Sequence, residues 1–298
     1  MLPKVSVMVI TYNQKDFIHE TIKSVLEQDY LNIEYVIADD GSTDGTAEVI
    51  NEYAKKYPNI IIPLINLPNV GITANSNRGL KACTGEYIAI QGGDDVFLPG
   101  KISKQVEWLE QDENRVLCGH YLNTCDENSI IIGKHVTIKV AGKGPENWIE
   151  QGTLYGATSI MLRASAINTN GFDERLPIVS DWKLYIDTLL KGGEYGYLTE
   201  CLGLYRKHDN NVTNIKEPVM KDAEETFNIL EKELKGCNKS IKIGRAYILD
   251  YGRGIQNLNI GNHKIAIQYF LKSIIRWPFN WKPYLRLAQS CFKTLIKR

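Results

Sequence analysis

The chain has 298 residues, of which 43% are hydrophobic and 23% charged, and its formal net charge is zero. This is the composition of a soluble globular protein, and no apolar run approaches the about 20 residues of a membrane helix. The N-terminal sequence MLPKVSVMVITYN alternates like a strand and lacks a signal-peptide cleavage site, and the 6 cysteines form no CxxC pair that would indicate zinc or a disulfide framework.

The zero net charge hides an asymmetry along the chain. Residues 1–216 contain 20 Lys and Arg against 28 Asp and Glu, whereas residues 217–298 contain 15 against 7. From Tyr251 to the last residue there is no acidic side chain. We therefore expect two regions, a domain at 1–216 and a basic helical region at 217–298, the latter able to seek an anionic surface.

Strand and helix patterns alternate in the first half of the chain. Apolar alternation predicts strands at 5–10, 33–38, 60–65 and 87–90, and helical periodicity predicts helices at 15–28, 43–57 and 72–84. Beyond residue 115 the pattern loosens, with strand-like segments at 129–138, 158–163, 195–198 and 202–206 and a helix at 182–190. From Pro218 onward the pattern is helical. This order predicts an α/β fold with a mainly parallel sheet.

Polar clusters follow three of the predicted strands, at residues 11–13, 39–42 and 92–95. The carboxyl ends of parallel strands lie at one edge of a sheet, where ligands of such folds bind. One cluster alone is explained by a helix cap or a turn. Three clusters at one edge predict a functional site.

With these clusters in place, the chain resembles the family 2 glycosyltransferases over about residues 4–213. The resemblance rests on VSVMVITYNQKDFIHETIKSVLEQDY, IEYVIADDGSTDGT, NVGITANSNRGLKACTGEYIAIQGGDD, GFDERLPIVSDWKLYI and LYRKHDNNVT, which occur in the family's order. It implies a GT-A (Rossmann-like) fold, a nucleotide-sugar donor, a divalent cation (Mn²⁺ or Mg²⁺) and inversion at the anomeric carbon by direct displacement.

The resemblance assigns the metal and donor diphosphate to an acidic turn. Asp94 is the expected metal ligand and Asp95 its neighbour at the donor, in a motif that often reads Asp-x-Asp-Asp. Gly92 stands where the motif has its first carboxylate, and it cannot supply that contact. A cation held there would act as a Lewis acid on the leaving diphosphate. The alternative is a strand-to-helix turn in which Asp serves as a cap.

The second acidic site is Asp181, which the resemblance makes the general base for the acceptor hydroxyl. Ser180 replaces the usual acidic neighbour, and the alternative role for Asp181 is a helix N-cap. His208 resembles the family histidine near the diphosphate, sometimes a metal ligand, or else is a surface histidine. Arg206 or Lys207 is expected to neutralise phosphate charge.

The nucleoside is expected to contact residues of the strand ends: Thr11, Asn13, Asp39 and Asp40. Arg78, on the third helix, is expected to contact a phosphate or the ribose. A carboxylate accepts the imide N–H of uracil or thymine, which adenine lacks on its pairing edge, so UDP or dTDP donors are favoured. GDP also offers N–H groups and stays open.

The acceptor is expected to be a saccharide or a lipid-linked saccharide bound by residues 145–180. There the aromatic side chains of Trp148, Tyr155 and Phe172 either stack on a sugar ring or serve as ordinary packing. The resemblance implies a role in cell-envelope polysaccharide or glycolipid assembly, and we expect the enzyme in the cytoplasm.

The tail has the spacing of a tetratricopeptide-type hairpin at Gly254, Ala266, Phe270 and Pro278. Residues 263–298 are basic and amphipathic, with aromatic side chains among Lys and Arg. They are expected either to lie on an anionic membrane face at the inner side of the cell membrane or to form a helix pair with a solvated basic face.

Two other functions compete with this interpretation. A nucleotidyltransferase would show a Gly-rich, basic loop after the first strand, unlike Thr11-Tyr12-Asn13-Gln14. A catalytically impaired scaffold protein that works through the basic helices is kept open by Gly92 and Ser180, and opposed by Asp94 and Asp181. No nucleic-acid-binding motif is present.

Overall fold

The computed structural model describes residues 2–135 and 140–296 and divides into two compact units. The first unit comprises Met1–Pro145 and Thr153–Asn214, and the second comprises Glu146–Gly152 and Ile215–Arg298. The second unit therefore begins close to the boundary expected from charge, and it also takes in a short segment from the middle of the chain. The functional division between the two regions stays a prediction.

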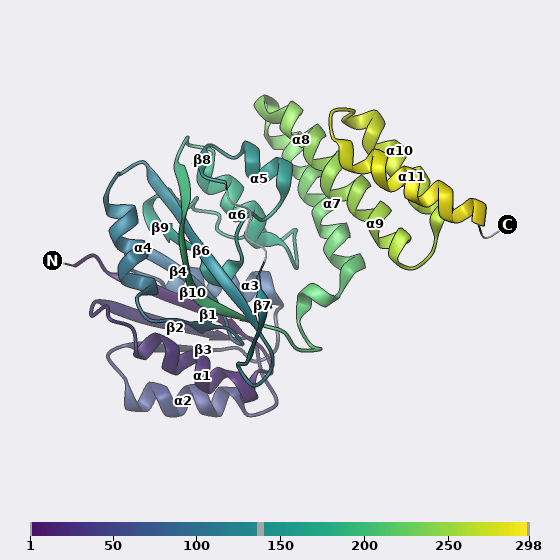
Figure 1. Ribbon diagram of the computed structural model, residues 1–298. Coiled ribbons are helices and arrows are strands. Elements are labelled where there is room, and N and C mark those ends of the chain that lie inside the picture. Colours follow the sequence, from purple (N-terminus) through teal and green to yellow (C-terminus); the bar gives the residue numbers. More distant parts are fainter. Residues whose placement is uncertain (1, 136–139, 297–298) are drawn as a thin grey trace. The chain divides into compact units, whose positions relative to one another are not determined.

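A single sheet of the described residues organises the first unit, and its parallel half carries the N-terminal strands (Figure 1). Neighbours in this half are all parallel, in the order β3-β2-β1-β4. The strands are β1 (Val5–Thr11), β2 (Ile33–Asp39), β3 (Ile61–Ile65) and β4 (Tyr87–Gly92). Val5, Val7 and Val9 are fully buried, because helices cover both faces of a parallel sheet.

The other half of the sheet is mixed. Strand β9 (Met161–Arg163) runs antiparallel to β4 and to β6 (Arg115–Cys125), and β6 is parallel to β10 (Glu194–Arg206). Short strands β5 (Val96–Phe97), β7 (Ile131–Lys134) and β8 (Gly142–Lys143) pair antiparallel with these. The predicted α/β fold with a central sheet flanked by helices is confirmed, and its parallel character belongs to the half that ends in the polar clusters.

Amphipathic helices connect the strands of the first unit. They are α1 (Lys15–Leu26), α2 (Thr46–Lys56), α3 (Ile72–Ala82), α4 (Lys101–Glu110) and α6 (Ser180–Leu189), with 3-10 turns at Ala157–Ser159, Ala164–Ala166 and Val212–Asn214. Ile18, Ile22 and Val25 recur at helical spacing on α1 and pack into the core with the buried valines of β1. This packing fixes the β1–α1 turn, where the first polar cluster lies.

All regular elements among the described residues of the second unit are helices. It contains α5 (Glu146–Gln151), α7 (Lys216–Glu233), a 3-10 turn at Lys235–Cys237, α8 (Asn238–Gly244), a π-helical stretch at Arg245–Tyr251, α9 (Gly252–Asn259), α10 (His263–Arg276) and α11 (Trp281–Ile296). Glycine at 254 lets α9 approach α10, because a β-carbon there would overlap the Phe270 ring. The expected hairpin is confirmed, with Leu258, Ala266 and Phe270 as its core. Along the described residues, no helix combines the length and apolar character needed to cross a membrane.

Several elements differ from the sequence-based expectation. Helix α4 is not among the expected elements, and strand β6 lies where the hydrophobic pattern loosens. The two short strands expected at 195–198 and 202–206 are one strand, β10, whose pairing with β6 shifts register between Leu198 and Gly203. The segment expected at 129–138 forms only β7, and residues 136–139 lie outside the described residues.

Candidate active site

The three polar clusters meet at one edge of the parallel half-sheet. Thr11 at the end of β1 is the register partner of Asp39 at the end of β2. On the other side of β1, Ile10 is the partner of Gly92, the last residue of β4. Strand register therefore brings these three clusters together, as the sequence predicted.

Asn13 and Asp39 tie the first two turns to each other. The Asp39 carboxylate is fully buried, and its Oδ2 accepts a hydrogen bond of 2.9 Å from the backbone N–H of Ser42. The Ser42 hydroxyl in turn accepts a 2.8 Å bond from the Asn13 N–H, while Asn13 Oδ1 accepts one of 2.8 Å from Thr43. Asn13 is exposed and has a left-handed backbone with φ of 50°, which Asn tolerates well. The nucleoside contacts expected of both residues stay predictions.

Asp40 and Arg78 converge on the loop that precedes α3. The Asp40 carboxylate is 3% exposed and accepts bonds from the N–H groups of Val70 (2.9 Å) and Gly71 (2.8 Å) and from the Asn66 amide (3.1 Å). Arg78 donates to the side chain of the same Asn66. These contacts give both residues a loop-positioning role, and their expected donor contacts are untested.

Asp94 and His208 lie 114 residues apart in sequence and touch in space. His208 Nε2 lies 2.8 Å from Asp94 Oδ2, and Asn211 Nδ2 donates to the same oxygen at 3.2 Å. Asn211 also accepts a 2.7 Å bond from the His208 N–H, so it braces both partners. Phe17 packs against the imidazole, with 4.9 Å between ring centroids. Sequence reasoning missed Asn211, although its position three residues after His208 is a usable signal.

Asp95 points into the protein, and its expected donor contact stays a prediction. It is 4% exposed, its Oδ1 accepts a 2.9 Å bond from the Arg206 N–H, and its Oδ2 accepts one from the Thr158 hydroxyl. Burial, with the neighbouring Asp94 carboxylate as a smaller cause, raises the pKa of Asp95 well above its ordinary value. The acid pair therefore has two environments, one carboxylate facing His208 and one held inside.

Arg206 is fully buried and does not serve as the phosphate contact that the sequence suggested. Its Nε donates to the Asp94 carbonyl at 2.7 Å. Its Nη1 donates to the carbonyls of Asp126 (3.1 Å) and Glu127 (3.0 Å), and its Nη2 donates to Glu20 Oε2 at 2.6 Å. The guanidinium thus holds the acidic turn, helix α1 and the loop before β7 together. The exposed Lys207 keeps its expected role as a prediction.

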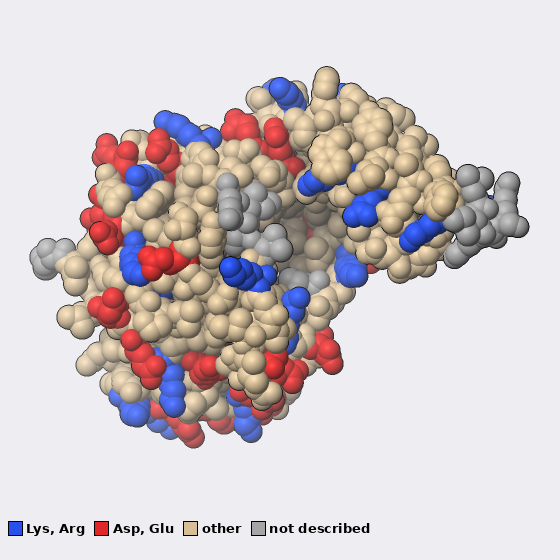
Figure 2. Space-filling model, viewed as in Figure 1, with Lys and Arg blue, Asp and Glu red and all other residues tan. Residues whose placement is uncertain are grey.

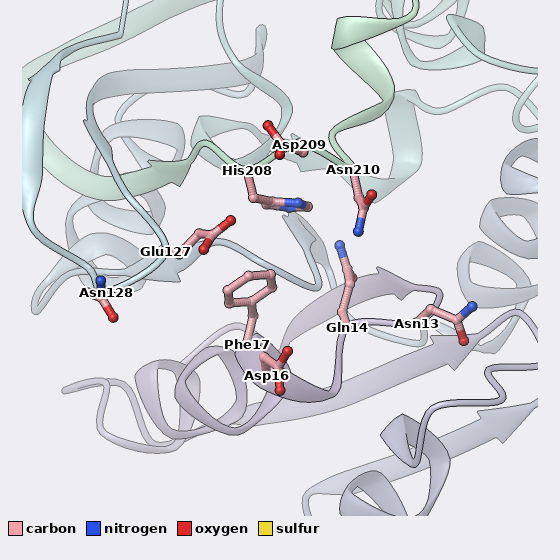
Figure 3. Close-up of a pocket in the computed structure, with 9 residues that line it drawn as sticks. All are labelled: Asn13, Gln14, Asp16, Phe17, Glu127, Asn128, His208, Asp209 and Asn210. Atoms are coloured by element: carbon pink, nitrogen blue, oxygen red, sulfur yellow. The ribbon is translucent and has the colours of Figure 1, made fainter.

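A cavity of about 560 Å³ opens beside His208 (Figure 3). Its described lining comes from the β1–α1 turn, the 127–128 loop and the residues after β10: Asn13, Gln14, Asp16, Phe17, Glu127, Asn128, His208, Asp209 and Asn210. Figure 3 shows the His208 ring near the middle, with Phe17 below it and Gln14 pointing up toward Asn210. Of these residues three are carboxylates and none is Lys or Arg, so a diphosphate bound here needs a cation beside it.

Two buried oxygens beside this cavity lack a hydrogen-bond partner among the described residues, Thr11 Oγ1 and Gln14 Oε1. Both face Gly93, where a β-carbon would overlap Gln14 Oε1 and lie 2.7 Å from Thr11 Oγ1. Buried polar atoms are nearly always hydrogen-bonded in native proteins. Unpaired oxygens at this edge of the sheet therefore point to a ligand or ordered water there.

Asp181 lies in the first turn of α6 and is not its N-cap. Val179 holds the cap position, where no side-chain cap bond forms. Asp181 Oδ1 accepts a 2.8 Å bond from the Trp182 N–H, and burial raises the pKa of its carboxyl to about 6. The Ser180 and Thr73 hydroxyls, 2.9 Å apart, fasten the start of α6 to α3. Asp181 is not among the described residues that line the cavity beside His208.

The three aromatic residues considered for acceptor stacking are interior. Trp148 is 0%, Tyr155 1% and Phe172 4% exposed. Their role is ordinary packing, and acceptor stacking by these rings is wrong.

The Asp94–His208 pair fits a divalent cation by its donor chemistry. A carboxylate oxygen and an imidazole nitrogen converge within 2.8 Å, and Mn²⁺ accepts both ligand types. Among the described residues no three His, Cys, Asp or Glu side chains gather as a complete metal site. Such a two-ligand arrangement suits cations that take their remaining ligands from substrate phosphates and water.

Comparisons with known proteins agree with the fold and the motifs. The family model described as glycosyl transferase family 2 matches residues 6–168. The uncharacterised protein Rv1520 of Mycobacterium tuberculosis is 31% identical over 221 residues, covering 70% of this chain and 60% of that protein. EpsE of Bacillus subtilis, which carries a glycosyltransferase name, is 36% identical over 167 residues, covering 56% and 59%. The chain thus spans about 60% of the length of these curated relatives.

Solved structures share the fold at low identity. S. aureus TarS 1–349 in complex with UDP-GlcNAc has a TM-score of 0.69 at 17% identity, covering 97% of this chain and 88% of that one. The mannosyltransferase PcManGT from Pyrobaculum calidifontis, in complex with GDP-Man and Mn²⁺, has a TM-score of 0.68 at 16% identity, covering 99% and 81%. The expected GT-A glycosyltransferase fold is confirmed, and the chain belongs to glycosyl transferase family 2.

Proposed function

We propose that this protein is an inverting glycosyltransferase that moves a sugar from a nucleotide-sugar donor to an acceptor hydroxyl. The observation that carries the proposal is the pairing of Asp94 with His208, 2.8 Å apart, beside a cavity of about 560 Å³. Asp94 follows the carboxyl end of β4 in the parallel half-sheet, the edge where such folds bind nucleotides, and His208 follows the end of β10. Family membership and the UDP-GlcNAc complex of TarS support a nucleotide-sugar donor.

Asp94 and His208 are the proposed ligands of a divalent cation, Mn²⁺ or Mg²⁺. When bound, such a cation neutralises the charge that develops on the leaving diphosphate. Asn211 orients both ligands through its hydrogen bonds, and Asp95 fixes the turn from inside by accepting the Arg206 N–H. The Mn²⁺ in the PcManGT complex supports this assignment.

Asp181 is the proposed general base. Its pKa of about 6 leaves the carboxylate ionised near neutral pH while keeping it a stronger base than an ordinary aspartate. Asp181 takes the proton of the acceptor hydroxyl as the oxygen attacks the anomeric carbon and the nucleotide diphosphate departs on the opposite face. A single direct displacement of this kind inverts the anomeric configuration.

The donor is proposed to be a UDP or dTDP sugar, with Thr11, Asn13 and Asp39 near the nucleoside. The structural neighbours include a UDP-GlcNAc complex and a GDP-Man complex, so the identity of the nucleobase must be measured. The acceptor is proposed to be a saccharide or a lipid-linked saccharide in cell-envelope assembly. We place the enzyme in the cytoplasm, peripheral at the inner face of the membrane.

The test is calorimetric titration of the protein with UDP, dTDP and GDP, each with Mn²⁺ and with EDTA. We expect one nucleotide to bind tightly with the cation and weakly without it. Absence of binding by all three nucleotides would overturn the enzyme proposal and favour a scaffold that has lost activity.

A further inference from the structure

Helix α11 presents an apolar stripe to solvent. At 100° per residue, Trp281, Leu285 and Phe292 fall within an arc of about 40° on one side of the helix. They are 67%, 56% and 64% exposed. Ser290, on the opposite side, is fully buried, and Leu287 packs against the core of the hairpin. The stripe is therefore the outward face of a helix whose inward face is already packed.

More exposed apolar side chains occur in the segment that leads into α11. Phe279, two residues before α11, is 87% exposed, and Ile275 near the end of α10 is 79% exposed. Isolated exposed apolar residues need no explanation. Several of them within one short segment mark a surface that binds a partner or a membrane. We call Ile275, Phe279, Trp281, Leu285 and Phe292 the α11 corner.

One flank of the α11 corner is cationic. On the same helical wheel Lys282, Arg286 and Lys293 fall about 100–140° from Trp281. Lys282 contacts the Tyr247 hydroxyl at 3.4 Å and Arg286 the Gln289 side chain at 2.8 Å. Within the described residues none of the three forms an ion pair with a carboxylate. Figure 2 shows basic side chains among uncharged ones on the visible face of this unit.

The apolar stripe and its cationic flank together indicate what binds the α11 corner. A second copy docked face to face through the same corner would bring Lys282, Arg286 and Lys293 against their own equivalents, which like-charge repulsion opposes. The surface of an anionic bilayer offers negative headgroups to the cations and hydrocarbon to the aromatic rings. We propose that the α11 corner docks the protein on an anionic phospholipid membrane.

Docking through α11 deepens the proposed function, since it places the enzyme where a lipid-linked acceptor lies. The docking proposal rests on the proposed function only for its biological role, because vesicle binding is measured without donor, cation or acceptor. Each Lys or Arg near an anionic membrane contributes about fivefold to binding, so the three flanking cations together contribute about a hundredfold.

The test is co-sedimentation of the full chain with phosphatidylcholine vesicles, with and without a large fraction of phosphatidylglycerol. We expect binding to the anionic vesicles and far less to the neutral ones. The triple variant Lys282→Glu, Arg286→Glu, Lys293→Glu should bind about a hundredfold more weakly. The matched control reverses Lys23, Lys55 and Lys56, exposed cations of α1 and α2, and should bind like the wild type.

A second variant, Trp281→Ser with Phe292→Ser, removes the apolar part and should also lower vesicle binding. We expect nucleotide affinity to be unchanged in all these variants. Titration with nucleotide therefore separates a failure of the docking proposal from a failure of the proposed function. Equal binding to both vesicle types, or unchanged binding by the triple variant, would overturn the proposal. So would a concentration-dependent dimer that the triple variant abolishes while vesicle binding persists.

Discussion

Replacing Arg206 by methionine tests how the candidate site is held together. The guanidinium makes five hydrogen bonds, to Asp94, Asp126, Glu127, Ser129 and Glu20, and its side chain is fully buried. Removing it leaves the buried acceptors unpaired, at about 1–3 kcal/mol for each that water cannot reach. Because the 127 loop is exposed and the Glu20 side chain is 45% exposed, we count the Asp94 carbonyl in full and the Glu20 ion pair only in part.

The expected loss of unfolding free energy for Arg206→Met is therefore about 3 kcal/mol. For a unit of this size that lowers Tm by about 6–12 °C. Arg206→Lys should fall between methionine and wild type, because an ammonium has three donors against the five of a guanidinium. The assay is urea and thermal unfolding followed by circular dichroism.

Arg175→Met is the matched control, because the Arg175 side chain is 55% exposed and pairs with Asp173 only two residues away. It should cost less than about 1 kcal/mol. In the cold, where the variant stays folded, Arg206→Met should also bind nucleotide and Mn²⁺ more weakly, since the Asp94 turn loses its anchor. If Arg206→Met unfolds like the control, the reasoning is refuted.

Three further predictions concern single groups. Because burial raises the Asp181 pKa to about 6 and the base must be ionised, kcat/KM should rise about tenfold per pH unit below about pH 6 and level off above it; a flat rate profile there would contradict the assignment. Burial lowers the pKa of Lys101 to about 7. Between about pH 7 and 10.5 this lysine is therefore protonated in the unfolded chain and neutral in the folded one, so the free energy of unfolding rises with pH across that window. Lys101→Met should therefore stabilise the protein more at pH 6 than at pH 9.5, by about 3 kcal/mol in unfolding free energy, and an equal effect at both pH values would count against it. A β-carbon at Gly92 would lie 2.8 Å from Asp94 Oδ1, so Gly92→Ala should weaken Mn²⁺-dependent nucleotide binding. Gly133→Ala should not, because a β-carbon at Gly133 meets open space. Calorimetric titration of the two variants with nucleotide and Mn²⁺ checks this.

The parallel half of the sheet was predictable because its signals are local. Valine alternation in β1 and helical spacing in α1 follow directly from the packing that buries them. The carboxyl-edge clusters were predictable for the same reason, since parallel strands bring their ends together. Strand β6 was not, because it contains Gly119, His120 and Asn123, residues with weak strand preference that are ordered by neighbours on both sides.

The candidate site was only partly predictable. The resemblance named Asp94 and His208, and the structure brings them together. It could not show that Asp95 turns inward or that Arg206 is a buried clamp, because both depend on contacts across more than a hundred residues. Burial of Trp148, Tyr155 and Phe172 likewise depends on tertiary packing that sequence spacing does not reveal.

The central claim is that Asp94 acts in cation-dependent donor binding and Asp181 in the chemical step. The most direct measurement compares Asp94→Asn and Asp181→Asn with wild type, by titration with the nucleotide sugar that the wild type binds and by its turnover. We expect that Asp94→Asn loses the gain in affinity from Mn²⁺, while Asp181→Asn binds within about twofold of wild type but does not turn over. Unchanged Mn²⁺-dependent binding by Asp94→Asn, or full turnover by Asp181→Asn, would contradict it.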